Sequence, residues 1–294
     1  MASTRILVNR RKAVRNIKKI TRTMELIATA RFKAAQRRAQ EAEAYTAKIA
    51  ELAADLAATA GEVTHPLLLK RDKVEKSVLL VICSNRGLCG GYNAGILREA
   101  TVALRRTTAE SIALQLELSG KRAINYFKYA GQKAAFQFTK FEDKPRFDEV
   151  EEIADRYLAD FISGKIDRVQ VAYMKYINPA VQKPVVVTLL PLDRSATPEA
   201  KKQEPAGKTI DYEFMPDARG ILEEILPVSF KVRLFKCFLD AAVSEQISRR
   251  VTMKQATENA NDMIKDITQQ YNRMRQANIT KEIMEIIGGV EALK

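Results

Sequence analysis

The sequence predicts an α/β protein that combines a long antiparallel two-helix coiled coil with a central Rossmann-like α/β domain. Residues 1–60 and 228–287 contain neither glycine nor proline, the strongest breakers of regular structure, and all nine prolines lie between Pro66 and Pro227. Two terminal helices separated by a domain can lie side by side only when they run antiparallel. The predicted parts are an N-terminal coiled-coil helix over 1–65, the central domain over 66–212 and a C-terminal coiled-coil helix over 213–294.

The N-terminal helix carries two stripes with the 4, 3 spacing of a coiled coil. The apolar stripe, which we expect to pack, consists of Ala13, Ile17, Ile20, Met24 and Ile27. The basic stripe, which we expect nearly opposite it, consists of Arg11, Arg15, Lys18 and Arg22. Alanines dominate the rest of this helix and favour it, and we expect it to end near Gly61.

Positive charge is concentrated in the first helix. Residues 1–40 hold twelve lysines or arginines against one acid, Glu25, whereas the whole chain has a net charge of +13. A cationic rod of this kind is expected to meet an acidic partner surface or another polyanion. A nucleic-acid-binding coiled coil is therefore the alternative function, although the first helix offers few aromatic side chains for base stacking.

The C-terminal helix is expected to begin after Met215, Pro216 and Asp217, with a kink or brief break at Pro227. Its apolar stripe is Ala256, Ala260, Met263, Ile267, Tyr271 and Met274. A second apolar stripe on a different face follows, with Ile279, Ile283, Ile286 and Val290. Since this helix exceeds the first by about 20 residues, or about 30 Å, we expect its end to leave the partner helix in the 270s and contact something else. The alternative is a plain helical hairpin, in which the apolar stripes only pack the two helices together and contact no partner.

Strands alternate with helices in the middle of the chain, which favours a largely parallel sheet. The expected strands are 77–83, 112–118, 169–177 and 185–192, the expected helices are 94–106, 121–130 and 149–162, and 193–210 is expected to be an exposed loop. A glycine-rich loop, Ser84–Asn93, follows the first strand where a doubly wound fold binds phosphates. Its glycine spacing matches neither dinucleotide nor P-loop motifs, so a tight, closely packed turn is the favoured role.

No catalytic or metal-binding constellation emerges. His65 is the only histidine, and Cys83, Cys89 and Cys237 form no C-x-x-C pair, so we predict no catalytic residue, cofactor or metal site. The longest apolar runs are far shorter than the roughly 20 residues that span a bilayer, and we see no secretory signal. Cysteine usage fits a reducing cytoplasm, and an enzyme that works alone is a third, less favoured interpretation.

Four segments resemble a known family. They are Ile17–Ala28, Ser84–Asn93, the group from Ser244 and Arg249 to Ala260, and Asn272–Ile286. Together, in this order, they resemble the gamma subunit of F-type ATP synthases. The resemblance implies a non-catalytic central rotor stalk that couples proton flow through the membrane c-ring to ATP synthesis in the alpha/beta hexamer. It also implies alpha, beta and epsilon subunits as partners, no nucleic acid, and a peripheral position on the cytoplasmic face of the bacterial plasma (inner) membrane.

The resemblance assigns partner contacts to nine positions. Met24 matches a methionine that faces the acidic loop of beta, and Arg86 lies in a loop that approaches an acidic segment of beta. Tyr212 and Glu213 fall near the ring. Four positions match C-terminal polar residues that affect coupling and touch the hexamer: Arg275, Gln276, Thr280 and Glu282. Arg249 is the ninth predicted contact.

The chain also departs from the family pattern. Arg249–Met253 replaces a common Arg-Met-x-Ala-Met, and Gly289-Val290 replaces a Gly-Ala. Phe214–Pro216 stands where members commonly have Tyr-Glu-Pro, which puts a carboxylate contact there in doubt. The cysteine insert of chloroplast members is absent, so thiol regulation is not expected.

Overall fold

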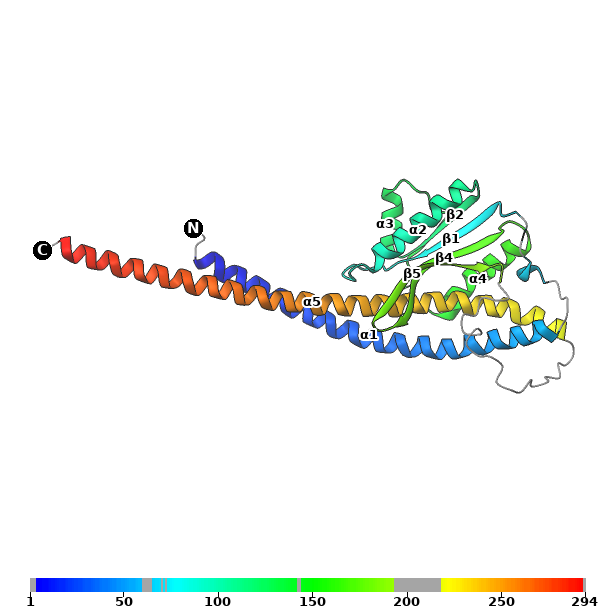
Figure 1. Ribbon diagram of the computed structural model, residues 1–294, viewed down its shortest axis with the longest axis horizontal. Coiled ribbons are helices and arrows are strands. Elements are labelled where there is room, and N and C mark those ends of the chain that lie inside the picture. The colour runs from blue at the N-terminus through cyan, green and yellow to red at the C-terminus, as the bar shows by residue number, and fades with distance from the viewer. Residues whose placement is uncertain are drawn as a thin grey trace. The chain divides into compact units, whose positions relative to one another are not determined.

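The computed structural model describes residues 4–59, 65–69, 71, 73–141, 144–192 and 218–292. Residues 30–248 form one compact unit, and residues 1–29 together with 249–294 form another. We call them the sheet unit and the helix-pair unit. Helices α1 (Thr4–Thr59) and α5 (Ala218–Ala292) each contribute a segment to both (Figure 1). The predicted boundaries near residues 65 and 212 follow secondary structure instead, and they stay a prediction.

The sheet unit contains a five-stranded sheet in the order β3-β2-β1-β4-β5. The strands are β1 (Lys76–Ile82), β2 (Ala113–Ser119), β3 (Phe136–Phe138), β4 (Arg168–Asn178) and β5 (Val181–Leu190). Strands β3, β2, β1 and β4 are parallel, and β5 pairs antiparallel to β4, so the expected largely parallel sheet is confirmed. Parallel neighbours need helical crossovers, and α2 (Tyr92–Ala109), α3 (Lys121–Tyr129) and α4 (Phe147–Ile162) supply them.

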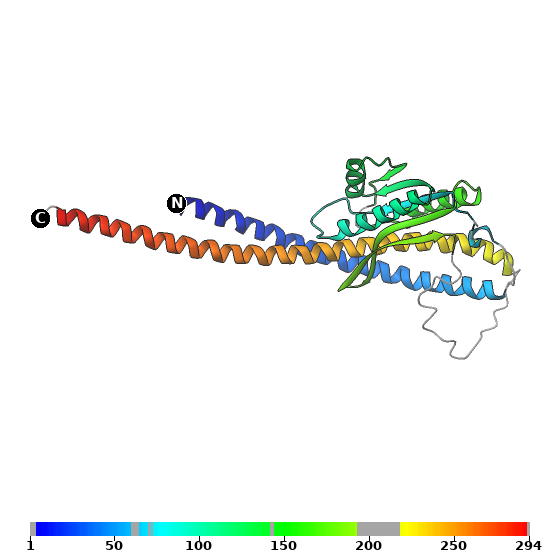
Figure 2. The same ribbon diagram turned by 45° about the horizontal axis from the view of Figure 1, so that its top comes forward.

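Helices cover both faces of this sheet (Figure 2). One face packs against α2 and α3 through residues such as Leu79, Leu118 and Ile96. The other packs against α4 and the first part of α5 through Leu80, Tyr157 and Phe230 among others. Successive β1 residues are buried on opposite faces, which explains why this strand reads as a continuous apolar run.

Three features of the sheet unit differ from the sequence-based expectations. Strand β3 and a short 3₁₀ helix, η1 (Pro66–Leu68), were not predicted, because three-residue elements leave no periodic signal. We expected a kink or a brief break at Pro227; helix α5 is continuous there, so the break is wrong. Leu226 and Phe230 are buried on either side of the proline, and their packing outweighs the backbone hydrogen bond that proline removes. The expected loop over 193–210 lies outside the described residues.

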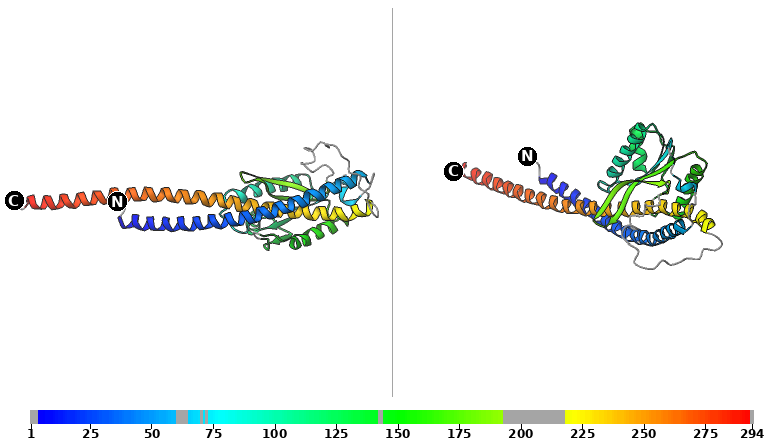
Figure 3. Two further views of the ribbon diagram at one scale, coloured as in Figure 1. Left: turned by 90° about the horizontal axis from the view of Figure 1, so that it is seen from below. Right: turned by 45° about the vertical axis from the view of Figure 1, so that its right-hand side comes forward.

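The sheet unit also includes part of the helix pair. Phe32, Ala35 and Ala39 of α1 pack against Leu239, Val243 and Ile247 of α5. The two segments run antiparallel, as predicted (Figure 3). Small residues on α1 let the two helices approach closely, while Phe32 fills the space beside Val243.

A buried carboxylate on β2 is paired with an arginine in the sheet unit. Glu117 on β2 is fully buried and accepts hydrogen bonds from both guanidinium nitrogens of Arg156, at 3.0 and 2.6 Å, and from the Tyr157 hydroxyl at 2.8 Å. The Arg156 guanidinium lies over the Phe136 ring, 3.9 Å from its centroid. Burial raises the pKa of the Tyr157 hydroxyl, and the neighbouring Glu117 carboxylate raises it further.

Candidate partner-contact surface

The helix-pair unit is held together by one stripe on each helix. On α5 one stripe of buried or half-buried residues has 4, 3 spacing: Met253, Thr257, Ala260, Ile264, Ile267, Tyr271 and Met274. On α1 the fully buried residues recur every seven positions: Leu7, Val14, Thr21 and Ala28. Leu7 and Val14 cluster with Ala260 and Ile267. This spacing is that of a left-handed coiled coil.

A polar pair lies inside this packed stripe. The hydroxyl oxygens of Thr21 and Thr257 are 2.8 Å apart and buried, and Thr257 Oγ1 also lies 2.8 Å from the Met253 carbonyl oxygen. Nearer the N-terminal end, the Arg11 guanidinium lies over the Tyr271 ring, 5.3 Å from its centroid. Single buried polar pairs fix the register of helix pairs, so these contacts specify which turns of α1 and α5 face each other.

The predicted packing stripe of the first helix is wrong. Ala13 is exposed, and Ile17, Ile20 and Ile27 are 52%, 59% and 47% exposed, while only Met24 is half-buried. The basic stripe does not lie opposite the packed face either, because Arg11 and Lys18 are half-buried beside Leu7, Val14 and Thr21. The apolar and the basic stripe have the same 4, 3 spacing, so periodicity alone could not show which face of α1 packs. The long stems of Arg11 and Lys18 can cover apolar surface while their charges stay in water.

The isoleucines therefore form an exposed apolar stripe on α1 that the helix pair itself does not cover. We call Ile17, Ile20 and Ile27 the α1 stripe. Contiguous exposed apolar side chains mark surfaces that a partner covers. Sequence reasoning gave these residues an internal role, and the signal against it was the weaker seven-residue repeat through Leu7, Val14 and Thr21.

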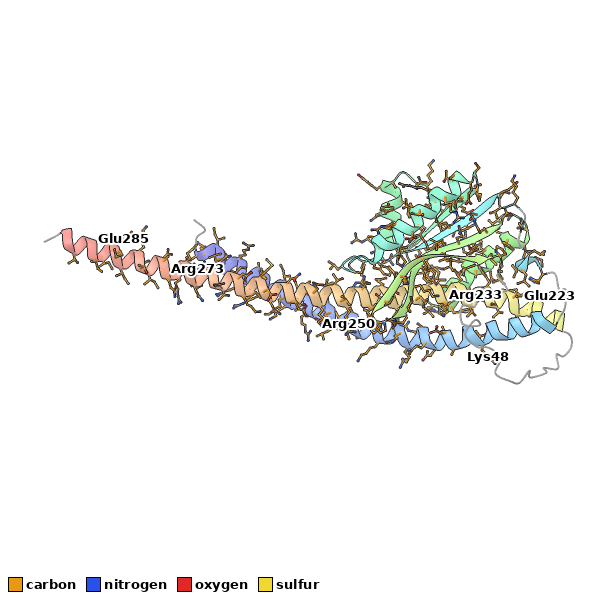
Figure 4. All side chains as sticks on the ribbon, viewed as in Figure 1. Lys48, Glu223, Arg233, Arg250, Arg273 and Glu285 are labelled. Carbon is orange, nitrogen blue, oxygen red and sulfur yellow. The ribbon has the colours of Figure 1, made fainter. Side chains whose placement is uncertain are left out.

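The end of α5 continues as a single helix past its contacts with α1. Every described side chain from Arg275 to Val290 is exposed, including Ile286 at 67%, and this stretch runs past the start of α1 (Figures 1 and 3). The expectation that the C-terminal helix leaves its partner helix in the 270s is therefore confirmed. Arg273 and Glu285, labelled in Figure 4 on this part of α5, are both exposed. The second apolar stripe, with Ile279, Ile283, Ile286 and Val290, lacks any packing partner among the described residues.

The predicted contact residues lie in several different parts of the chain. Arg275, Gln276, Thr280 and Glu282 are all exposed on the single-helix end of α5. Met24 is half-buried beside the α1 stripe, whereas Arg249 is buried within the helix-pair unit at 8% exposure. Arg86 is an exposed residue of the sheet unit. Tyr212 and Glu213 lie outside the described residues.

Arg86 belongs to a loop that is folded tightly on itself. Asn93 Nδ2 donates to Ser84 Oγ at 2.8 Å and to Cys89 Sγ at 3.1 Å, while the Ser84 backbone N–H donates to Asn93 Oδ1 at 3.0 Å. Asn85 ties the loop to the carbonyl oxygens of Thr139 and Phe141. Side chains thus hold this loop from within.

The geometry of this loop agrees with the tight turn that we favoured. Gly90 has a φ of 56°, a left-handed conformation that suits glycine. The cavity bordered by Cys83, Tyr92 and Glu245 measures about 20 Å³, which is about the volume of one water molecule. The loop geometry therefore does not support the nucleotide-binding interpretation.

The chain matches known proteins along its whole length. The model of the family described as ATP synthase matches residues 3–293. The chain is 52% identical over 295 residues to the ATP synthase gamma chain of Rhodopirellula baltica, and 38% identical over 293 residues to that of Leptospira biflexa, with 100% of each chain covered.

The chain belongs to the ATP synthase gamma-chain family. Its role is that of the central stalk, and the relatives described above do not support the nucleic-acid alternative. The fold agrees with solved structures of low identity. A chain of the Euglena gracilis mitochondrial ATP synthase OSCP/F1/c-ring complex gives a TM-score of 0.64 at 16% identity, covering 99% of this chain and 94% of that one. A chain of the Tetrahymena thermophila central stalk and c-ring gives 0.56 at 19% identity, covering 81% of this chain and 99% of that one.

No described helix combines the length and the apolar character needed to cross a bilayer. In the described part of the chain, no group of three or more histidine, cysteine, aspartate and glutamate side chains is arranged to hold a metal ion.

Proposed function

We propose that this chain is the rotor stalk that transmits torque between a proton-driven membrane c-ring and the alpha/beta hexamer of an ATP synthase. The observation that carries the proposal is the exposed apolar surface of the helix-pair unit, formed by the α1 stripe and the second apolar stripe of α5. The proposed partners are the alpha, beta and epsilon subunits and the c-ring. The chain contributes no catalytic residue, and it lies peripherally on the cytoplasmic face of a bacterial plasma membrane.

The helix pair has the stiffness that a torque-transmitting element needs. Neither the α1 segment up to Thr29 nor the α5 segment from Arg249 to Ile287 contains proline or glycine. The hydrogen-bonded pair of Thr21 and Thr257 fixes the register of the two segments. Antiparallel helices that interdigitate resist twisting and bending better than a single helix, because side chains of one must slide past those of the other. Torque applied at one end is then carried to the other.

The exposed surface of the shaft suits a rotating contact. The α1 stripe and the second apolar stripe of α5 offer non-directional hydrophobic contact, whose free energy depends on the area covered and not on a fixed partner atom. A sleeve that gripped by many hydrogen bonds would lose each of them at every step. The positive charge of α1 adds attraction to an acidic surround that also needs no fixed geometry.

We assign the polar residues at the end of α5 the role of holding the rotor at particular angles. Arg275, Gln276, Thr280 and Glu282 occupy exposed positions where a loop of the hexamer can hydrogen-bond to them at one rotor angle. Met24, beside the α1 stripe, is proposed to face the acidic loop of beta, and Arg86 a second acidic segment. The contacts of Tyr212 and Glu213 with the ring rest on the family resemblance alone.

The proposal is tested by shortening the single-helix end. Deletion of Ile283–Lys294 removes exposed side chains and no packed contact of the described chain before Ile283. In membrane vesicles with alpha, beta, epsilon and the c-ring, we expect proton-driven ATP synthesis to fall several-fold. The urea unfolding of the sheet unit should stay unchanged. Normal ATP synthesis by the truncated chain at equal assembly would refute the contact of the α5 end. Failure of the unmodified chain to co-purify with the other subunits would refute the stalk role.

Matched substitutions separate the apolar stripe from helix length. The test variant carries Ile283→Gln, Ile286→Gln and Val290→Gln. The control carries Arg273→Gln, Lys281→Gln and Glu285→Gln on the polar side of the same helix. Covering an aliphatic side chain contributes about 1.5–3 kcal/mol when burial is complete, so the test variant should lose most of the coupling that the control keeps. Equal loss of coupling in the test and control variants would indicate that the substitutions act on helix stability and not on a partner contact.

A further inference from the structure

The helix-pair unit contains a groove between α1 and α5. Its volume is about 740 Å³. The residues that line it are Lys12, Arg15, Asn16, Lys18 and Lys19 on α1, and Asn261, Ile264 and Lys265 on α5. The lining carries five positive charges and no carboxylate.

Four of the five cations have no counter-charge within the described chain. Lys265 Nζ lies 3.0 Å from Asp262 Oδ1, but no described carboxylate forms an ion pair with Lys12, Arg15, Lys18 or Lys19. Arg15 lies one helical turn from both Lys18 and Lys19, and like charges at such spacing destabilise a helix. An anion in the groove would relieve this repulsion.

We propose that this groove binds a small oligophosphate anion, the chemistry shared by inorganic tripolyphosphate and the phosphate tail of a nucleoside triphosphate. Lysine ammonium groups bind phosphate as point charges, and each can donate to any oxygen that comes within reach. Asn16 and Asn261 add uncharged donors on opposite walls of the groove. The side chain of Ile264 also lines the groove.

The charge density of the groove favours phosphate over a run of carboxylates. A phosphate carries up to about two negative charges on three strong acceptor oxygens, whereas each acidic side chain carries one charge on a flexible stem. From Lys12 to Lys19 the groove extends for seven residues of α1, or about 10 Å. A short phosphate chain can reach all four unpaired cations over that length, whereas an extended acidic peptide would have to run beyond the groove.

Binding of tripolyphosphate to the purified full-length chain by isothermal titration calorimetry tests the proposal. We expect one site per chain in about 0.1 M salt, weakened as salt rises because both partners are charged. ATP should bind with similar affinity when the phosphates alone are recognised, and at least tenfold more tightly when the base adds contacts. AMP, with a single phosphate, should bind far more weakly than either.

Matched variants separate a groove from general attraction to a cationic chain. The groove variant carries Lys12→Gln, Arg15→Gln and Lys19→Gln. The control carries Arg10→Gln, Lys33→Gln and Arg273→Gln, which removes the same charge from exposed positions outside the groove. Three lost charge contacts should weaken tripolyphosphate binding about tenfold or more, and the control should stay within about twofold of the unmodified chain.

The proposal also has a readout that needs no substitution. Bound tripolyphosphate should protect Lys12, Lys18 and Lys19 from acetylation more than Lys33. Equal loss of affinity in both variants, several weak sites in place of one, or uniform protection would overturn it. Displacement of tripolyphosphate by a decaglutamate peptide that binds more tightly would overturn it as well, and would assign the groove to an acidic protein segment.

Discussion

A buried carboxyl in the sheet unit makes the stability of this chain depend on pH. Asp240 lies on α5 at 4% exposure, and among the described residues its Oδ2 atom has no hydrogen-bond partner. Burial is the main cause that raises the pKa of the Asp240 carboxyl to about 7; the Glu43 carboxylate acts in the same direction, and the charges of Lys236 and Lys175 act in the opposite one. Lys236 Nζ instead lies 3.1 Å from Glu43 Oε1, so its charge is already engaged.

The size of the effect follows from proton linkage. The folded chain keeps a proton on Asp240 up to about pH 7, whereas an unfolded aspartate loses it near 3.8. Between these values the unfolded state binds fewer protons, so the contribution of this group to stability falls as pH rises. A shift of about three pKa units, at 1.36 kcal/mol each, corresponds to about 4 kcal/mol lost between pH 4 and pH 8.

Replacement of Asp240 by asparagine tests this reasoning. The amide keeps the shape of the side chain and cannot ionise. We expect Asp240→Asn to unfold much like the unmodified chain near pH 4, and to be more stable by an amount approaching 4 kcal/mol at pH 8. Urea unfolding, followed by tyrosine fluorescence at several pH values, measures both curves.

The comparison between variants removes the titration of all other groups. Asp266→Asn, on an exposed position of the same helix, should shift the stability equally at pH 5 and pH 8. The reasoning is refuted if the difference between Asp240→Asn and the unmodified chain is the same at both pH values. Tyr173, Tyr176 and Cys237 also lie close to Asp240, but burial raises the pKa of each of them, so they stay neutral in this range.

Three further substitutions test the structure and the site. Glu117→Gln leaves the Arg156 charge without its buried carboxylate and should cost about 3–5 kcal/mol in urea unfolding. Gly120→Ala places a methyl group 2.1 Å from the Cys83 carbonyl oxygen at a φ of +95°, and should lower the melting temperature by several degrees at a cost above about 1 kcal/mol. Met24→Lys adds a charge beside the α1 stripe and should lower the ATP yield per proton at unchanged assembly.

Each of these substitutions has a control. Glu152→Gln removes an exposed carboxylate from the same sheet unit and should change the unfolding free energy by less than about 0.5 kcal/mol. Gly91→Ala adds a methyl group with nothing within 4 Å, so it should leave the melting temperature nearly unchanged. Met24→Leu keeps the apolar contact and should preserve coupling, and equal ATP yields for the lysine and leucine variants would contradict the proposed contact.

The long-range pattern of the sequence determined most of the architecture. The absence of glycine and proline from both ends predicted α1 and α5, and buried apolar runs predicted β1, β2, β4 and β5 within a few residues of their observed bounds. The change of apolar face in the 270s predicted the point at which α5 becomes a single exposed helix. These features are local or periodic, so they can be counted along the chain.

The tertiary structure alone decided which face of α1 packs. Two stripes with identical 4, 3 spacing run along this helix, and the more apolar one, with Ile17, Ile20 and Ile27, lies outside. Spacing gives the period of a helix contact but not its rotational phase. The phase depends on which side chains interdigitate with α5, where Thr21 finds a hydroxyl partner and small Ala28 allows close approach.

Contacts between distant residues were equally invisible in the sequence. Glu117 and Arg156, or Asp240 and Glu43, have no spacing that marks them, because their proximity depends on how β2, α4, α1 and α5 come together. The cationic groove is of the same kind, since α1 supplies four of its five charges and α5 supplies the opposite wall with Lys265. Patterns along one segment reflect its own geometry, whereas a site needs several segments placed in space, and only folding supplies that placement.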